Sequence, residues 1–401
     1  MALSDNELNV LARDALQRAA AGDFVSAERL FTQVVDARPN SGQALHLLGQ
    51  ARLKLGRFAD AREPLERAAK FLPRESAAQV NLAGCLTVLG EHEAALVALE
   101  RASKLKPGDP AIAHNRGRAL EALGRRDEAE RAYDEALAAD HRLLPSLTAR
   151  AGLLAARGDW MGALADLDMA LTARPSDPQL RLRRSELYLR QGDWLRGLPD
   201  YEARFGSPAA RYAPDLPRWN GEAVEGRLLL YPEQGDIESD AAMRDTLMLA
   251  RGVAAPMDVV VQCAPRLAQW LKEPTARRGD PLDGFAASAP LRSLPYLLGW
   301  TLQSLPPPPP LRRVPDRGDR IGWFTSREPP AGWEIERDPD QVAQCRRVVG
   351  DDNWPTHLAA RLGIPTELLL DGDADWLWGA DLGASPWYVR LETKREVDAG
   401  R

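Results

Sequence analysis

The sequence predicts an α-helical solenoid followed by a shortened α/β domain with parallel sheets. Six glycines, from Gly22 to Gly192, follow one another at a constant interval of 34 residues, which predicts six stacked helix–turn–helix repeats. This interval is lost after about residue 207, where short apolar runs begin to alternate with amphipathic stretches. Strand, helix and strand in this order are typical of a doubly wound parallel sheet of the Rossmann type.

Each repeat carries small residues where its two helices must approach closely, and a proline closes most units. The residues at these positions are Gly22, Gly56, Gly90, Gly124, Gly158 and Gly192 in the turn, Ala27, Ala61, Ala95, Ala129, Ala163 and Gly197 five residues later, Ala68, Ala102, Ala136 and Ala170 further on, and Pro39, Pro73, Pro107 and Pro175 at the end. A unit of this length and pattern is the signature of tetratricopeptide repeats. Because one unit cannot bury its apolar face alone, the six should stack into a curved solenoid whose inner surface forms a groove for a partner.

Composition and charge exclude several classes of function. The 401 residues include 52 Lys and Arg against 58 Asp and Glu, a net charge of −6, which argues against nucleic acid or an anionic membrane as the main partner. We expect a cytoplasmic protein without membrane insertion, because no signal-peptide pattern and no long apolar run is present. Cys85, Cys263 and Cys345 are too widely spaced for a metal site, and we expect reduced cysteines that serve packing.

The second half predicts two small α/β lobes joined by a proline run. Strands are expected at 227–231, 257–263, 320–326, 345–350 and 366–370, with helices at 239–252, directly after residue 263, around 338–344 and at 356–363. The segment after Trp270 is expected to be irregular, and five prolines at 306–310 are expected to form a stiff joint. The predicted domains are therefore 1–207 (repeats), 208–305 (linker and first lobe) and 306–401 (joint and shortened second lobe).

Several motifs occur in an order that resembles a known family. They are GDWLRGLPDYEARF, PRWNGEAVEGRLLLYPEQGD, DDNWPTHLAARLGIPTELLL, DWLW and SPWY. Together with the repeats they resemble bacterial proteins whose C-terminal part looks like O-linked N-acetylglucosamine transferases, and the HLAARLGIP segment is also similar to ADP-heptose heptosyltransferases. The resemblance implies a GT-B architecture, in which two Rossmann-like lobes hold a nucleotide-sugar and the repeats hold the acceptor protein.

The resemblance assigns the loop after residue 231 to the acceptor side. Here the family has a second glycine and an aspartate after its Glu-Gln-Gly, whereas this chain has Gly235 followed by a longer insertion. Either Asp236 or Asp245 then takes the place of the family's aspartate as a candidate catalytic base, while Gly235 allows close approach of substrate. The alternative is that both carboxylates are ordinary surface groups.

A second motif would receive the diphosphate of the donor at a helix N-terminus. Asp352 and His357 match the motif, and Asn353 fills the turn after Asp352, so these three are the candidate nucleotide-sugar-binding residues. For His357 the sequence favours the alternative of a structural hydrogen-bonding group. Trp354 is expected to place an indole where the family has a small residue, and Pro355 removes an amide donor. The sequence therefore predicts a blocked phosphate site in a truncated lobe.

On the repeats, the candidate peptide-groove residues are Asn81, Asn115, His46 and His114. Asn81 and Asn115 occupy the same position in consecutive units, and in the transferase family such asparagines hold the backbone of an extended peptide, since an amide both donates and accepts. His46 and His114 precede the equivalent position by one residue. The alternative is that these are merely solvated polar residues.

The sequence therefore favours a repeat scaffold that captures a polypeptide and carries a degenerate glycosyltransferase-like domain. The alternative is an active protein O-glycosyltransferase that uses a nucleotide-sugar such as a UDP-sugar. No cofactor and no metal site are predicted for the scaffold.

Overall fold

The structure is a computed structural model that describes residues 4–206, 212–234, 236–251, 253, 257–301, 303–307, 318–330, 334–370 and 387–388, together with the backbone of 391–395. Of the sequence predictions, Gly235, the DWLW motif at 375–378 and most of the proline run lie outside these residues. The chain divides into two compact units, Met1–Pro175 and Ser176–Arg401. The three-part domain division drawn from the sequence stays a prediction.

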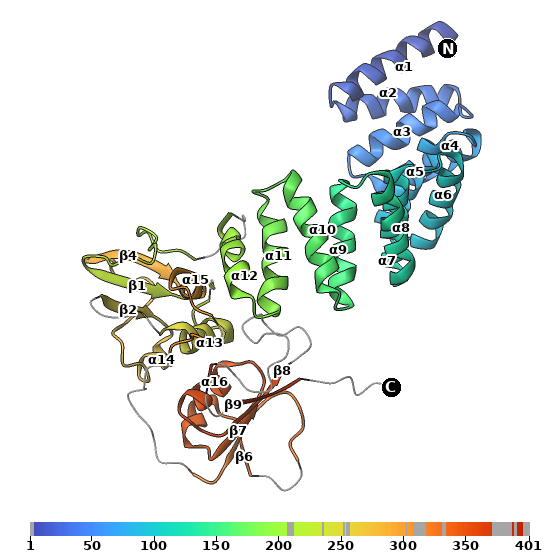
Figure 1. The fold of residues 1–401 in the computed structure, drawn as a ribbon. Helices are drawn as coiled ribbons and strands as arrows, with labels where there is room; N and C mark the ends of the chain where they lie inside the picture. Colours follow the sequence, from blue (N-terminus) through green and yellow to red (C-terminus); the bar gives the residue numbers. More distant parts are fainter. Residues whose placement is uncertain are drawn as a thin grey trace. The chain divides into compact units, whose positions relative to one another are not determined.

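The described part of the first unit is entirely helical and consists of five helical hairpins (Figure 1). Its helices are α1 (Asp5–Ala20), α2 (Phe24–Ala37), α3 (Gly42–Lys54), α4 (Phe58–Phe71), α5 (Ser76–Val88), α6 (His92–Leu105), α7 (Pro110–Ala122), α8 (Arg126–Ala139), α9 (Leu144–Ala156) and α10 (Trp160–Ala173). The odd-numbered helix of each hairpin packs against the following even-numbered one. This confirms the helical solenoid predicted from the glycine interval.

The turn glycines and the alanines have the roles that the sequence indicates. All six turn glycines have a positive φ, between 73° and 85°, which costs little without a side chain. Ala27, Ala61, Ala95, Ala129 and Ala163 are completely buried where the two helices of a hairpin meet. Gly117 is needed for the same reason, because a Cβ there would lie 2.4 Å from the ring of Tyr133.

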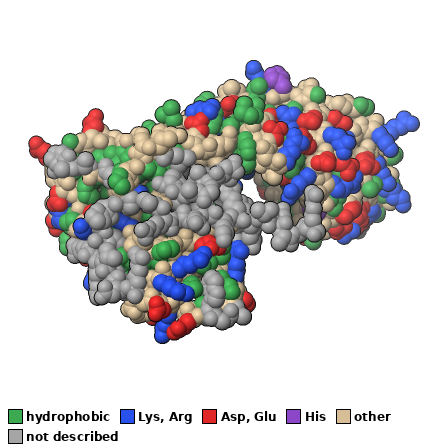
Figure 2. All heavy atoms as spheres, turned by 60° about the horizontal axis from the view of Figure 1, so that its bottom comes forward, with side chains coloured by type: hydrophobic (Ala, Val, Ile, Leu, Met, Phe, Trp, Pro, Cys, Tyr) green, Lys and Arg blue, Asp and Glu red, His purple; other side chains and the backbone are tan. Residues whose placement is uncertain are grey.

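Helices α3, α5, α7 and α9 line the inner side of the solenoid. Each of them contacts the next one in this series, whereas the even-numbered helices are further from one another. We therefore call α3, α5, α7 and α9 the inner helices and α4, α6, α8 and α10 the outer helices. Figure 2 shows that positive and negative side chains are interspersed over the visible face of this unit.

The second unit begins with the last helical hairpin. Helices α11 (Pro178–Arg190) and α12 (Trp194–Tyr201), followed by the 3₁₀ helix η1 (Glu202–Gly206), belong by sequence to the sixth repeat. Pro199 lies inside α12, as the sequence indicates, and α12 is shorter than the outer helices of the earlier repeats. Leu189, Trp194 and Leu198 are buried in the same hydrophobic cluster as the two sheets that follow.

The first sheet has four parallel strands in the order β3-β2-β1-β4. Its elements are β1 (Arg227–Tyr231), α13 (Asp240–Leu249), β2 (Asp258–Gln262), α14 (Pro265–Ala268), β3 (Thr275–Ala276), β4 (Phe285–Pro290), η2 (Leu291–Ser293) and α15 (Leu294–Leu297). The prediction of an irregular segment after Trp270 was wrong, because β4 lies there and pairs in parallel with β1 from Arg227 to Tyr231, with one register shift after Arg227. The run FAASAP forms this strand through pairing rather than through its own β-propensity, since three of its residues are alanine and one is proline.

The second sheet has five parallel strands in the order β6-β5-β7-β8-β9. Its elements are β5 (Ile321–Phe324), β6 (Ile335–Glu336), η3 (Pro339–Gln344), β7 (Arg347–Gly350), α16 (Trp354–Arg361), β8 (Thr366–Leu370) and β9 (Leu391–Arg395). Three of these strands were predicted, whereas β6 and β9 were not. The two strand orders are those of doubly wound sheets, in which ligands bind where the direction of winding reverses, at the carboxyl ends of the strands.

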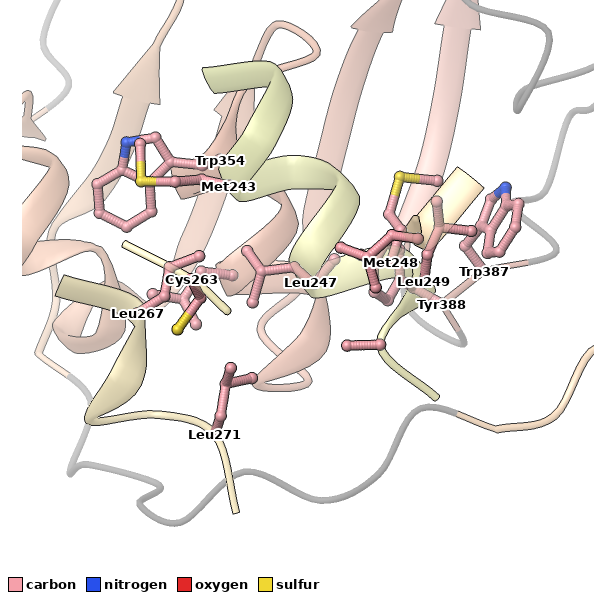
Figure 3. Packing of buried hydrophobic residues seen from close by; sticks show 14 of the residues in the cluster. Met243, Leu247, Met248, Leu249, Cys263, Leu267, Leu271, Trp354, Trp387 and Tyr388 are labelled. Atoms are coloured by element: carbon pink, nitrogen blue, oxygen red, sulfur yellow. The ribbon is translucent and has the colours of Figure 1, made fainter. Parts of the chain in front are cut away.

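One hydrophobic core connects the elements of the second unit (Figure 3). It contains residues of α12, β1, α13, β2, β7, α16 and β8, and also Trp387 and Tyr388. Cys85 of the first unit and Cys263 and Cys345 of the second are buried free thiols, as expected. Among the described residues, no helix combines the length and the apolarity needed to cross a membrane.

Candidate functional site

The inner helices bring the predicted groove residues together in pairs. The side-chain amide nitrogen of Asn81 on α5 lies 2.6 Å from Nε2 of His46 on α3. Nδ1 of His114 on α7 lies 3.0 Å from the hydroxyl of Ser146 on α9. Burial lowers the pKa of both histidines, and nearby Arg118 lowers the pKa of His114 further. Both rings are therefore neutral at pH 7, so in each ring one nitrogen donates a hydrogen bond and the other accepts one.

Asn81 and Asn115 differ in how they are engaged. Both side chains are partly exposed, but the amide of Asn81 already faces His46, whereas Asn115 makes no side-chain hydrogen bond to any residue that the structure describes. An amide on an exposed helix face offers one acceptor and two donors to a peptide backbone. Among the described residues, the amide of Asn81 thus has a side-chain partner and the amide of Asn115 has none, although the two lie on neighbouring inner helices.

In the second unit, Asp245 lies at the carboxyl edge of the first sheet and is fully buried. Its carboxylate accepts from Nε of Arg292 at 2.7 Å and from the side-chain amide of Gln234 at 2.7 Å, and Arg244 is a further ion-pair partner. Burial by itself raises the pKa of this carboxyl, but Arg292 and Arg244 outweigh it and hold the pKa below its usual range. A carboxylate with a lowered pKa is a weak base, so this geometry is that of a structural ion pair.

Asp236, the other candidate base, lies apart from this pair. It is exposed, and its carboxylate accepts from the backbone amide of Glu238 within the turn that precedes α13. The structure therefore does not bring Asp236 and Asp245 into one group. Glu233 of the same loop is buried and accepts from Nε of Arg204 at 2.7 Å, and the Arg204 guanidinium also donates to Ser293 Oγ at 2.6 Å.

At the carboxyl edge of the second sheet, the structure brings Asp352 and His357 together. Nε2 of His357 lies 2.8 Å from Asp352, and its Nδ1 lies 3.2 Å from the hydroxyl of Tyr388. Burial lowers the pKa of His357, against the opposing effect of Asp352. The neutral ring then donates from Nε2 to the carboxylate and accepts at Nδ1 from Tyr388. Asp352 also pairs with Arg244 on α13.

The amides at the start of α16 are occupied by groups of the chain itself. The side chain of Asn353 caps the helix by accepting from the Thr356 amide at 3.3 Å, and its own amide donates to the Phe324 carbonyl at 2.7 Å. The Trp354 amide faces the Asp240 carboxylate at 3.5 Å, and Pro355 has no amide hydrogen. A phosphate placed at this helix N-terminus would therefore have to displace a carboxylate and a capping side chain.

The expected position of Trp354 was wrong. Its indole does not lie in the turn but is buried in the hydrophobic core beside Met243 (Figure 3). The turn is filled by another group, since the Thr356 hydroxyl lies so close to Gly350 that a Cβ there would be 2.1 Å from it. The start of α16 is thus lined by Thr356, Asn353 and Asp240 rather than by the indole.

The residues that sequence reasoning missed are the arginines. Arg204, Arg218, Arg244 and Arg292 pair with Glu202, Glu233, Asp245 and Asp352, so the cations and carboxylates of this group are equal in number. The signal was present in part, because an arginine within the apolar stretch of α13, as in AAMRDTLML, indicates a buried charge that needs a partner. The identity of each partner could not be read from the sequence.

Comparison with known proteins confirms the repeats. The tetratricopeptide-repeat profile matches residues 18–84 and 86–150, and a second tetratricopeptide-repeat profile matches residues 148–210. The chain therefore carries tetratricopeptide repeats through its first half. The search of curated proteins gives no match.

Solved structures of repeat proteins are similar to the helical part of the chain. A thermophilic TPR protein of Thermus thermophilus is 28% identical, with 45% of this chain and 99% of that chain covered and a TM-score of 0.37. The structure of pilF of Pseudomonas aeruginosa is 17% identical, with 51% of this chain and 94% of that chain covered and a TM-score of 0.46. YrrB, described as a TPR protein with an unusual peptide-binding site, is 19% identical. The match covers 42% of this chain and 87% of that chain, with a TM-score of 0.38.

Proposed function

We propose that the chain is a protein-binding scaffold that captures a polypeptide on its inner helices and carries a degenerate glycosyltransferase-like domain of the GT-B type. The observation that carries this proposal is the state of the candidate donor site. The amides at the start of α16 face Asn353 and Asp240, and Arg244 and Arg292, which lie beside Asp352 and Asp245, are paired with these carboxylates. Few hydrogen-bond donors are therefore left there to bind a diphosphate. On the inner helices, by contrast, the partly exposed amide of Asn115 is available to a partner.

Packing in the second unit supports loss of catalysis. In a working GT-B enzyme the two lobes face each other across a cleft that takes the nucleotide-sugar. Here α13 of the first sheet contacts α16 of the second, and Arg244 joins them through Asp352. The two sheets also share one hydrophobic core. An enzyme that must admit a nucleotide-sugar between them would have to break these contacts.

The rival function is an active protein O-glycosyltransferase. One observation favours it, because Gln234, Asp245, Asp352 and Asn353 all lie near the carboxyl ends of parallel strands, where doubly wound sheets bind their ligands. Calorimetric titration with UDP- and ADP-sugars separates the two proposals. Absence of binding heat supports the scaffold, while micromolar binding together with sugar on a bound polypeptide, detected by mass spectrometry, would establish the enzyme.

The groove is tested with peptides selected against the full-length chain from a displayed library of short random sequences. The double variant Asn81→Ala/Asn115→Ala should raise the dissociation constant of the selected peptides about tenfold or more, since both amides would be lost. Gln33→Ala, which removes an exposed amide on α2, is the matched control and should leave the affinity unchanged. Equal affinity of the double variant and the wild type would contradict capture on the inner helices.

A further inference from the structure

The inner helices contain two glycines for which their own packing gives no reason. Gly84 lies inside α5 and Gly152 inside α9, and a Cβ at either position would meet nothing within 4 Å. In this they differ from Gly49 and Gly117 of α3 and α7, whose Cβ would collide with Leu65 and Tyr133. Glycine inside a helix is less favourable than alanine, so an open position of this kind is expected to be alanine or larger.

These two glycines belong to one row across the repeats. Counting by 34 residues, the row reads Gln50, Gly84, Arg118 and Gly152, and it lies three residues after the row that contains Asn81 and Asn115. Residues three apart on a helix are neighbours on one face. Gly84, Arg118 and Gly152 are all exposed, so the two amides and the two open glycines share the same surface. A glycine on such a surface lets another backbone approach the helix closely.

Charge on the two helix layers is unequal. The inner helices carry five basic residues and one acidic residue, whereas the outer helices carry seven basic and twelve acidic residues. Arg52, Arg116 and Arg150 are already paired with Glu28, Glu135 and Asp166. The acidic exception, Glu121, accepts a hydrogen bond from the Tyr133 hydroxyl.

Arg118 is left as an exposed cation in the middle of this surface. It makes no ion pair with any residue that the structure describes, and it lies near enough to His114 to lower the pKa of that ring. Lys54, at the end of α3, is a second exposed basic residue of the inner helices. An arginine prefers a carboxylate partner, which it binds through two parallel hydrogen bonds.

We infer that the inner helices bind an extended acidic polypeptide segment, whose backbone passes over Gly84 and Gly152 and whose carboxylate pairs with Arg118. This inference rests on the proposed function and specifies its partner. The asparagines bind the backbone and so fix the segment in the groove, while Arg118 selects for its charge. The glycines set how closely the segment lies, because a methyl group at either position would hold the backbone away from the helix.

The test uses the same displayed library of short random sequences against the full-length chain, followed by synthesis of the selected peptides. We expect the selected sequences to be enriched in Asp and Glu. Arg118→Gln should raise their dissociation constant about tenfold and reduce its dependence on salt. Gly84→Ala and Gly152→Ala should each weaken binding several-fold while raising the melting temperature, a combination that damage to the fold cannot produce. Arg101→Gln, on the outer helix α6, is the matched control for loss of charge.

The outcomes distinguish this inference from the proposed function. Selected peptides without acidic enrichment, or with unchanged affinity for the Arg118→Gln and Gly84→Ala variants, would overturn the inference. If those peptides still lost affinity for Asn81→Ala/Asn115→Ala, capture on the inner helices would stand. Failure to select any peptide, or indifference of the selected peptides to both asparagines, would overturn the proposed function together with the inference.

Discussion

Glycines of the inner helices differ in what they contribute to stability. Gly84 and Gly152 lie in helix interiors without any contact that requires glycine, so each is expected to lower the stability of its own repeat. Gly117 has the opposite status, because the ring of Tyr133 occupies the place of its Cβ. Substitution by alanine should therefore raise the free energy of unfolding at Gly84 and Gly152 but lower it at Gly117. The two kinds of position are adjacent within the 34-residue repeat.

We expect Gly84→Ala and Gly152→Ala each to increase the free energy of unfolding by about 0.5–1 kcal/mol, the difference between the helix propensities of the two residues. Gly117→Ala should instead destabilise by about 1–3 kcal/mol, because Tyr133 must move. Urea denaturation followed by far-ultraviolet circular dichroism measures all three. Destabilisation by Gly84→Ala would show that the position is packed after all.

A second residue with a measurable signature is His357. Its buried ring has a lowered pKa in the folded chain, so the unfolded chain, with a histidine pKa of about 6.5, binds the proton more readily. The contribution of His357 to stability is therefore fully present above about pH 6.5 and is lost as the pH falls through the folded-state pKa. We expect the free energy of unfolding to decrease as the pH is lowered below about 6.5. The variant His357→Gln should show a weaker dependence of the free energy of unfolding on pH.

Tryptophan fluorescence is the appropriate probe for this experiment, since ten of the 11 tryptophans lie within residues 176–401. His357→Gln lowers stability at pH 7 by loss of the Asp352 and Tyr388 contacts, so the comparison rests on the slope and not on the absolute value. An identical slope in the wild type and the variant would show that His357 does not titrate on unfolding.

At the scale of elements, the sequence predicted those helices and strands that have a local periodic pattern of apolar residues or glycines. The helical hairpins follow from the glycine interval, and β1, β2, β5, β7 and β8 follow from short apolar runs. Strand β4 was missed because its alanines and proline have low β-propensity, and β3 and β6 because each has only two residues. The helix expected after residue 263 is short, since α14 ends at Ala268. These elements depend on pairing and packing with distant segments.

The candidate site could be predicted to the same extent. The motifs indicated Asp245, Asp352, Asn353 and His357, and the structure brings Asp352 and His357 into contact and links Asp352 to Asp245 through Arg244. The sequence could not indicate that arginines from α13 and η2 neutralise these carboxylates. It also could not indicate that Trp354 turns into the core, because a tryptophan at a helix start is compatible with either direction. Ion pairing and side-chain direction are decided by tertiary structure.

At the scale of the whole molecule, the last repeat is a structural part of the second unit. Trp194 of α12 lies in the shared core with its ring 5.7 Å from that of Trp387, and Arg204 of η1 is fully buried against Glu233 of the loop after β1. Cutting the chain between the repeats and the sheets at residue 207 would separate both pairs. A fragment that begins at Ser176 keeps them.

We expect Arg204→Met to destabilise the second unit by about 3–5 kcal/mol, because Glu233 would remain buried without its cation. The double variant Arg204→Met/Glu233→Leu should recover much of this loss, since no buried charge is left unpaired. Tryptophan fluorescence in urea reports the second unit, while circular dichroism is dominated by the helices of the first. Equal stability of Arg204→Met and the wild type would show that this ion pair contributes nothing.

The shared conformation of the six turn glycines has an evolutionary consequence. Since the turn glycine has nearly the same φ in all six repeats and each unit contacts only its neighbours, a gene that gained or lost 34 codons would add or remove one unit with the same turn. Each added or removed unit would lengthen or shorten the row of inner helices by one helix, and with it the surface that this row presents.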